Sequence, residues 1–391
     1  MLNLLWLLLP MAAASGWYLA KKEYQRKTAE QSYELPQDYY KGLNYILNEQ
    51  PDKAIDLFIK ISELDNGIVE IHLALGSLFR KRGEVDRAIR THQGLINQSS
   101  LSNEIYIQAL HELALDYMSA GLLDRAEDLC LELVDMDGRN LAALHILQEI
   151  YQQEKEWFRA IEMARKITLC SPEKQSHIIA HYYCELANDV RKKGDITQAR
   201  RMLDKALSDD ASCGRAVIIL GKIEQNLGNF AEAIDAYQRL DSAAPEYLSE
   251  VLPALQICYE SLGQSSQLVE YLRRIVHRHH AVELVLGATH ILNRYAGEEA
   301  ALNFLMREVH QNPSLRGVQR LLELDISRQE KDNVGHMRVI KASLDKLLTN
   351  KPIYRCISCG FTGMEMHWCC PSCKRWSSVK PIQEFQWGAS I

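Results

Sequence analysis

A short pattern of small, aromatic and alanine positions recurs along most of the chain from about residue 38. The first copy has Gly42, then Tyr45 three positions later, and Ala54 twelve positions after the glycine. The alanine-type residue of successive copies is found at positions 54, 88, 126, 160, 199, 233, 268 and 301. The steps between them are 33 to 39 residues, so the pattern has a period near 34.

A period near 34 residues is typical of the tetratricopeptide repeat, a pair of short antiparallel helices. The small residue on the first helix lets the second helix approach closely, and turn signals such as Arg82-Gly83-Glu84 separate the two. The pattern therefore predicts an all-α superhelix of about eight repeats over 37–315, and apolar positions predict further terminal helices over 316–351. An irregular helical bundle is the alternative, and eight copies at a near-constant offset argue against it.

The first twenty residues contain no charged side chain and are followed directly by Lys21 and Lys22. Twenty helical residues span about 30 Å, the thickness of a bilayer's hydrocarbon core. This predicts an N-terminal transmembrane helix over 1–20, a basic juxtamembrane linker over 21–36, and a body that faces the cytoplasm. A cleaved signal peptide is the alternative, because small residues occupy 12–16, but no positive charge precedes the apolar run.

The strongest chemical signal is a pair of CxxC sequences, Cys356–Cys359 and Cys370–Cys373, separated by ten residues. Each CxxC turn directs two thiolates toward one ion, and two facing turns complete a tetrahedral site. Thiolate ligands select zinc or iron. We predict a small rubredoxin-like metal ribbon over 352–391 that holds one metal ion, with zinc favoured and iron as the alternative. Four protein ligands close the site, which indicates a structural role rather than hydrolysis.

The other cysteines are predicted not to bind this ion. Cys369 breaks the CxxC spacing, and His367 is a weak competitor for the same reason. The cysteines of the array are predicted to be buried small apolar residues, namely Cys130, Cys170, Cys184, Cys213 and Cys258. Because half of the ten cysteines cluster within 356–373, the pattern indicates metal in a reducing compartment rather than a secreted disulfide framework.

The 391-residue chain has a formal net charge of −6, which is unevenly distributed. Residues 1–30 carry +2 and residues 351–391 carry +3, so the part between them carries −11. An acidic body disfavours nucleic-acid binding along its length. RNA binding through the ribbon is an alternative, because basic and aromatic residues gather there: Lys374, Arg375, Lys380, Trp368, Trp376 and Trp387. We favour the interpretation that these aromatics dock the ribbon onto the last helices of the array, because so small a module has little core of its own.

No catalytic motif is found in the sequence. It has no GxGxxG, GxxxxGK[ST] or GxSxG, and His111-Glu112 begins like a zincin helix but Leu115 replaces the second histidine. The histidines at 277, 279, 280 and 290 have no Asp or Cys at a fixed ligand spacing. The sequence therefore predicts a protein that is not an enzyme.

The order of these parts resembles the lipopolysaccharide assembly protein B family, also called LapB or YciM. The resemblance covers essentially the whole chain, and the ribbon and the apolar N-terminus make it specific. The matching residues are Tyr354-Arg355-Cys356-x-x-Cys359-Gly360-Phe361, Cys370-Pro371-Ser372-Cys373, Trp376-Ser377, Lys380-Pro381-Ile382, Trp6-Leu7-Leu8-Leu9-Pro10 and Gly16-Trp17.

The resemblance implies an inner-membrane adaptor that faces the cytoplasm and regulates lipopolysaccharide synthesis. In that family the adaptor promotes degradation of the deacetylase LpxC by the protease FtsH. The regulator PbgA/YejM restrains it, and other lipopolysaccharide-assembly proteins are further expected partners. A tetratricopeptide scaffold for other clients is an alternative, and so is an iron-loaded redox partner.

Tetratricopeptide arrays hold partner proteins in an inner groove that is lined by the first helix of each repeat. Projecting the groove positions of such arrays onto this sequence implies nine partner-binding residues: Arg80, Lys81, His111, His181, Asn188, Arg191, Arg215, Lys222 and Asn226.

Overall fold

The computed structural model describes residues 37–64, 69–98, 101–328, 335–349 and 351–382. The chain divides into two compact units, Met1–Ile146 and Leu147–Ile391, and each is described by itself. The described part is almost entirely helical, with one small sheet near the C-terminus. This confirms the prediction of an all-α tetratricopeptide array followed by a small ribbon.

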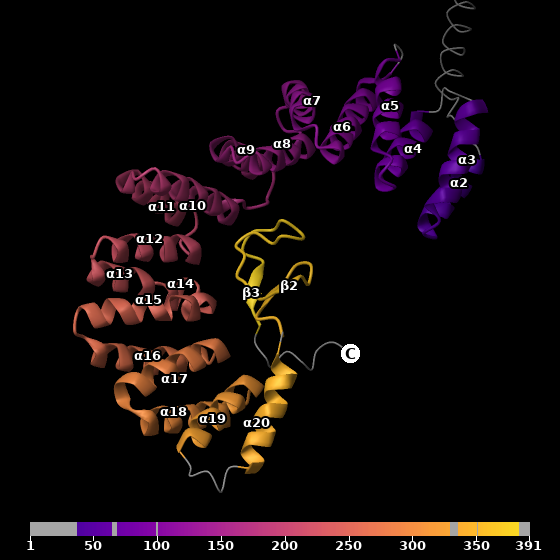
Figure 1. The fold of residues 1–391 in the computed structure, drawn as a ribbon. Coiled ribbons are helices and arrows are strands. Elements are labelled where there is room, and N and C mark those ends of the chain that lie inside the picture. The colour runs from indigo at the N-terminus through magenta and orange to yellow at the C-terminus, as the bar shows by residue number, and fades with distance from the viewer. Residues whose placement is uncertain (1–36, 65–68, 99–100, 329–334, 350, 383–391) are drawn as a thin grey trace, which may run out of the picture. The chain divides into compact units, whose positions relative to one another are not determined.

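The first unit consists of helices that follow one another in antiparallel pairs (Figure 1). Their bounds are α2 (Gln37–Leu47), α3 (Pro51–Leu64), α4 (Val69–Lys81), α5 (Val85–Ile96), α6 (Asn103–Ala120) and α7 (Leu123–Met136), and α8 (Leu141–Gln153) spans the boundary between the units.

Glycines on the first helix of a pair explain part of the fixed spacing within a repeat. A Cβ atom added to Gly42 would lie 2.4 Å from the ring of Phe58, and one added to Gly76 would lie 2.4 Å from the ring of His92. In both pairs the ring comes sixteen positions after the glycine, on the second helix. The small residue therefore makes room for a specific side chain of its own repeat.

The second unit continues the helical array and ends in the ribbon. Its helices are α9 (Trp157–Cys170), α10 (Ser176–Lys192), α11 (Ile196–Asp209), α12 (Gly214–Asn226), α13 (Phe230–Gln238), α14 (Leu240–Ala243), the short 3-10 turn η2 (Pro245–Tyr247), α15 (Leu248–Ser261), α16 (Ser265–His279), α17 (Val282–Ala296), α18 (Glu298–Gln311), α19 (Leu315–Arg328) and α20 (Gly335–Leu348). One continuous apolar cluster runs from Val217 on α12 to Leu324 on α19. Within it, Gly221 and Tyr237 repeat the glycine-and-ring pairing at the same offset of sixteen.

The ribbon, which we define as residues 351–382, contains a three-stranded antiparallel sheet in the order β2-β1-β3. Its strands are β1 (Tyr354–Cys356), β2 (Thr362–Gly363) and β3 (Val379–Pro381), with Arg355 opposite both Thr362 and Lys380. Its buried core consists of only four residues: Tyr354, Cys356, Cys370 and Val379. Figure 1 shows the ribbon, in yellow, on the inner side of the stacked helices of its own unit.

The predicted transmembrane helix requires correction. No helix in the described ranges is long and apolar enough to cross a membrane. The longest of them, α6, has 18 residues and is interrupted by Glu104, Glu112 and Asp116. This overturns the transmembrane part of the predicted fold class and the single-pass inner-membrane localisation drawn from it. Residues 1–36, on which the predicted anchor and linker rested, lie outside the described residues.

Candidate metal centre and ribbon–array junction

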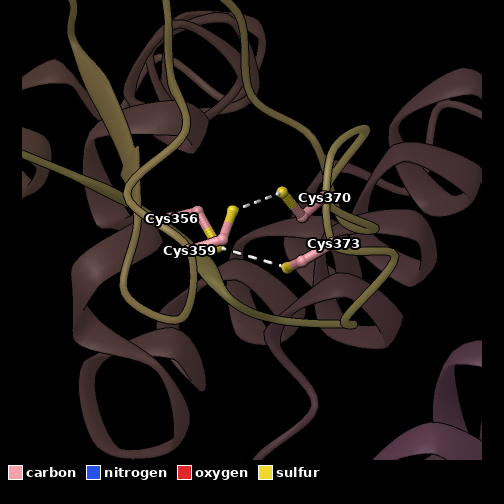
Figure 2. A group of neighbouring side chains, drawn as sticks. All are labelled: Cys356, Cys359, Cys370 and Cys373. Carbon is pink, nitrogen blue, oxygen red and sulfur yellow. Dashed lines mark hydrogen bonds between the residues drawn. The ribbon is translucent and has the colours of Figure 1, made fainter. Parts of the chain in front are cut away.

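The four cysteines of the two CxxC sequences come together at one end of the ribbon (Figure 2). Their sulfur atoms all lie within 4.8 Å of one another. The Sγ atoms of Cys356 and Cys373 are 3.7 Å apart, and so are those of Cys359 and Cys370. A disulfide needs about 2.05 Å between sulfurs, whereas four sulfurs at about 2.3 Å around one zinc ion are about 3.8 Å apart along each tetrahedral edge. The spacing therefore suits a single tetrahedral metal ion.

Two equivalent turns present these thiols. In the first, the N–H of Gly360 donates to the carbonyl of Cys356 at 3.0 Å; in the second, the N–H of Lys374 donates to the carbonyl of Cys370 at 2.9 Å. Gly360 and Lys374 both have left-handed backbone angles, with φ of 79° and 59°. Glycine adopts this conformation without strain, so the sequence indicated the first turn, whereas the lysine gave no such signal for the second.

The pKa values of the thiols differ within the group of four. Burial raises the pKa of Cys356, but its contact with the Ser378 hydroxyl and the backbone N–H groups of Cys359 and Ser358 outweigh burial and bring the pKa to about 6. The N–H of Phe361 lowers the pKa of Cys359. Burial raises the pKa of Cys370 to about 11. Since the thiolate is the ligand form, a bound cation would hold all four groups deprotonated.

Cys369 and His367 lie apart from the group of four. The thiol of Cys369 donates to the backbone carbonyl of Lys374 at 3.2 Å. The ring of His367 makes an edge contact with Phe361, with 6.2 Å between centroids. In the described part of the chain, neither residue belongs to a cluster that could hold a metal ion.

Trp376 is the main apolar link between the ribbon and the array. Only 9% of this side chain is exposed. Its ring stacks on His181 of α10 at 4.9 Å between centroids and meets Tyr182 edge-on at 6.0 Å. Its indole N–H donates to the side-chain oxygen of Gln152 at 2.9 Å. A second ribbon residue, Trp368, packs on Tyr247 of η2 at 4.8 Å.

Polar contacts fix the orientation of the ribbon on the array. The Lys380 ammonium donates to Glu246 at 2.6 Å and to the Tyr247 hydroxyl at 2.9 Å. The Tyr354 hydroxyl donates to Glu250 of α15 at 2.5 Å. These contacts and those of Trp376 define the ribbon–array junction.

The position of the junction corrects the prediction that the ribbon docks onto the last helices. The ribbon instead contacts α10, η2 and α15, in the middle of the array. The aromatic partners of its tryptophans lie there, whereas α20 has no buried residue and exposes Val339, Ile340 and Leu347. Proximity in sequence was therefore a poor guide to docking.

His181 is held neutral at the junction. Burial lowers its pKa most, and the positive charges of Arg215, His177 and Lys380 lower it further, to about 3. Its Nε2 lies 2.5 Å from the Ser377 hydroxyl, while its buried Nδ1 has no partner. A protonated His181 would add a buried charge beside two cations, so the junction favours the neutral ring.

The basic and aromatic surface invoked for RNA binding is largely used within the protein. Trp376 and Lys380 face the array, and Arg375 donates to the Ser358 hydroxyl at 2.6 Å. Lys374 is exposed. Trp387 lies outside the described residues.

In the first unit, the three residues predicted to bind partners do not form one open surface. Arg80 pairs with Glu112 and with the fully buried Asp116, each at 2.6 Å. Asp116 also contacts His92 at 2.5 Å, so Arg80 belongs to an internal ionic network. His111 is half-buried beside this network, and burial lowers its pKa. Lys81 is exposed at the end of α4.

In the second unit, four of the predicted residues come together. Asn188 and Arg191 of α10 and Arg215 and Lys222 of α12 line one pocket of about 190 Å³. Ile218, Ile219 and Trp368 complete its wall. His181 lies instead beneath the ribbon, and Asn226 is exposed near the end of α12.

Sequence reasoning missed the array side of the junction. Gln152, Tyr182, Glu246, Tyr247 and Glu250 all contact the ribbon. None of them belongs to a motif, and their partners lie more than 100 residues away in the sequence.

Comparisons with known proteins agree with this architecture. A family model described as a rubredoxin metal binding domain matches residues 354–381, and two tetratricopeptide repeat models match residues 71–103 and 184–247. These matches support a metal site in the ribbon and repeats in the array.

Curated relatives match nearly the whole chain. Lipopolysaccharide assembly protein B of Escherichia coli strain K12 is 39% identical over 384 residues, which cover 98% of this chain and 99% of the relative. The Haemophilus influenzae protein of the same name is 34% identical over 393 residues, covering 98% of each. The solved structure of MamA covers 43% of this chain and 93% of its own, at 21% identity and a TM-score of 0.34, which is too low to bear on function. Because the chain has a repeat array and a four-cysteine ribbon and matches these relatives over nearly its full length, it belongs to the lipopolysaccharide assembly protein B family.

Proposed function

We propose that this protein is a non-enzymatic scaffold of lipopolysaccharide assembly that promotes degradation of the deacetylase LpxC by the protease FtsH. Membership of the family supports the pathway, and the tetratricopeptide fold supports protein or peptide partners. The finer assignment of LpxC, FtsH and the restraining regulator PbgA/YejM rests on the resemblance to the family.

The observation that carries the scaffold proposal is the ribbon seated on the inner side of its unit of the array. The ribbon contacts α10 through Trp376, η2 through Lys380 and α15 through Tyr354. Such an arrangement fixes the relative positions of several repeats, and a fixed surface binds a partner with less ordering cost than a mobile one.

We assign one metal ion, zinc in preference to iron, to Cys356, Cys359, Cys370 and Cys373. The ion would hold the two turns together and so supply folding energy to a ribbon whose own core is four residues. Since four protein thiolates fill a tetrahedral shell, no position remains for a substrate, and the role is structural.

The scaffold would act by proximity. A protein that holds a client and a protease at the same time converts their encounter into an intramolecular event, with an effective concentration in the millimolar range for short tethers. The helices of the first unit and the ribbon-bearing second unit each offer a surface of their own, which suits two different partners. PbgA/YejM would restrain the scaffold by occupying one of them.

The test is capture of the full-length protein from detergent-treated cells, with partners identified by mass spectrometry. A Cys356→Ser/Cys359→Ser variant is compared with the control Cys369→Ser, which removes a thiol outside the group of four. We expect LpxC and FtsH with the native protein and with Cys369→Ser, and loss of at least one from the double variant. Absence of both from the native protein would contradict the proposed function.

A further inference from the structure

The pocket beside the ribbon collects positive charge that nothing in the described chain neutralises fully. It is lined by Arg191, Arg215 and Lys222, together with Asn188, and no carboxylate lines it. The nearby carboxylate of Glu185 accepts from Nη2 of Arg215 at 2.8 Å, which balances one of the three cations. The pocket therefore keeps an excess of positive charge, although the middle of the chain is acidic.

Two buried donors at this pocket lack acceptors. Arg215 is only 7% exposed, and its Nη1 has no hydrogen-bond partner. Nε of Arg191 is also buried and without a partner. Buried polar groups in native proteins are nearly always hydrogen-bonded. These two donors are closed to solvent and have no acceptor, so the positive charge of both guanidinium groups beside the pocket is only partly compensated.

The remaining residues that line the pocket are apolar, and they come from both the array and the ribbon. Ile218 and Ile219 belong to α12, and Trp368 belongs to the ribbon. The guanidinium of Arg215 also lies 5.6 Å from the ring of Trp376, so the ribbon holds this cation in place. A ligand that suits this lining carries an anionic group next to an apolar group.

We propose that this pocket binds the carboxylate of an acidic peptide segment, with a neighbouring apolar side chain against Trp368 and the two isoleucines. Arginine forks pair with carboxylates through two parallel hydrogen bonds, and about 190 Å³ accommodates one such group with part of its neighbour. The proposal deepens the proposed function, on which it rests for the source of the peptide. It assigns the client-binding surface to the ribbon–array junction.

The probe is the blocked dipeptide acetyl-Leu-Glu-amide, with acetyl-Leu-Gln-amide as its neutral match. Full-length, metal-loaded protein carries 5-fluorotryptophan, and the ¹⁹F signal of Trp368 is assigned from Trp368→Phe. We expect a saturable shift of that signal with the glutamate dipeptide and binding about tenfold weaker with the glutamine dipeptide, as loss of a charge-assisted pair implies. Acetyl-Leu-Leu with a free C-terminus tests whether a terminal carboxylate serves equally.

The matched variants are Lys222→Gln, in the pocket, and Lys193→Gln, an exposed residue beyond the end of α10 that does not line it. We expect about tenfold weaker binding for the first, because it removes one of the pocket's charges, and no change for the second. An unmoved Trp368 signal, equal binding of the two dipeptides, or tighter binding of inorganic phosphate than of the glutamate dipeptide would overturn the proposal.

This experiment is independent of the test of the proposed function. If the dipeptide binds but LpxC and FtsH are not captured, the pocket stands and its peptide comes from another protein. If both are captured but the dipeptide does not bind, the scaffold stands and this pocket is not its client site.

Discussion

Replacing Gly221 by alanine tests whether the two helices of a repeat need a glycine in order to pack closely. Gly221 lies on α12, and an added Cβ would be 2.4 to 2.7 Å from three ring atoms of Tyr237 on α13. Ordinary contacts with a Cβ begin near 3.4 Å, so the ring or one of the two helices must shift by up to about 1 Å. Tyr237 is fully buried and its hydroxyl donates to Gln225, so the ring has no free space to move into.

The expected cost follows from two opposing effects. Overpacking a well-filled core costs about 1–3 kcal/mol. Alanine in place of a helical glycine returns roughly 0.5–1 kcal/mol, because it restricts the unfolded chain. We therefore expect a net destabilisation of about 0–2.5 kcal/mol for Gly221→Ala.

Gly94→Ala is the matched control. Gly94 also lies within a helix, α5, but nothing lies within 4 Å of its added Cβ. Only the restriction of the unfolded chain by alanine then acts, and we expect stabilisation of roughly 0.5–1 kcal/mol.

The assay is thermal unfolding followed by the helical circular dichroism signal. At about 2–4 °C per kcal/mol for 150–250 residues, Gly221→Ala should lower the midpoint by up to about 10 °C, and Gly94→Ala should raise it slightly. If both variants moved the midpoint in the same direction, close approach of the helix pair would not be the reason for the glycine.

Three further predictions concern the ribbon. Trp376→Ala should weaken the ribbon–array junction by about 3–5 kcal/mol, as loss of a buried tryptophan does. The ¹⁹F signal of Trp368 should then change to that of the undocked ribbon at a lower urea concentration. Met364→Ala, which alters an exposed residue of the ribbon, should leave this urea concentration unchanged. Acidification should loosen the ribbon–array junction, because the pKa of His181 is about 3 when the ribbon is docked and about 6.5 when it is released. The released state binds more protons between these two values, so docking of the ribbon is complete above about pH 6.5 and weakens as the pH falls toward 3. This pH dependence should be lost in His181→Gln. Removal of metal by a chelator should unfold the ribbon, seen as loss of the dispersed amide signals of Tyr354 and Val379, while the helical signal of the array is retained; a ribbon that stays folded without metal would contradict the assigned role of the four thiols.

The array could be predicted from the sequence because its packing is local. In three repeats a glycine and the ring that fills the space beside it are sixteen residues apart, as Gly42 with Phe58 and Gly221 with Tyr237 illustrate. The grouping of the four cysteines could be predicted for the same reason, since each CxxC turn is closed by hydrogen bonds within five residues.

The junction could not be predicted because its contacts are distant and chemically ordinary. Trp376 and Gln152 are 224 positions apart, and Tyr354 and Glu250 are 104 apart. A glutamine or a glutamate on a helix surface carries no signal that a ribbon will cover it. The same difficulty applies to the pocket: groove positions of repeat arrays suggested Arg191, Arg215 and Lys222 together with Arg80, and only the structure separates the open cationic pocket from the internal ionic network of Arg80.

The half-life of LpxC in cells tests the central claim most directly. An Escherichia coli strain that lacks its own assembly protein B is supplied with this protein, and LpxC is followed after synthesis is stopped. The account predicts rapid, FtsH-dependent loss of LpxC with the native protein and with Cys369→Ser, and a several-fold longer half-life with Trp376→Ala at equal protein levels. An LpxC half-life that is the same with and without this protein would contradict it.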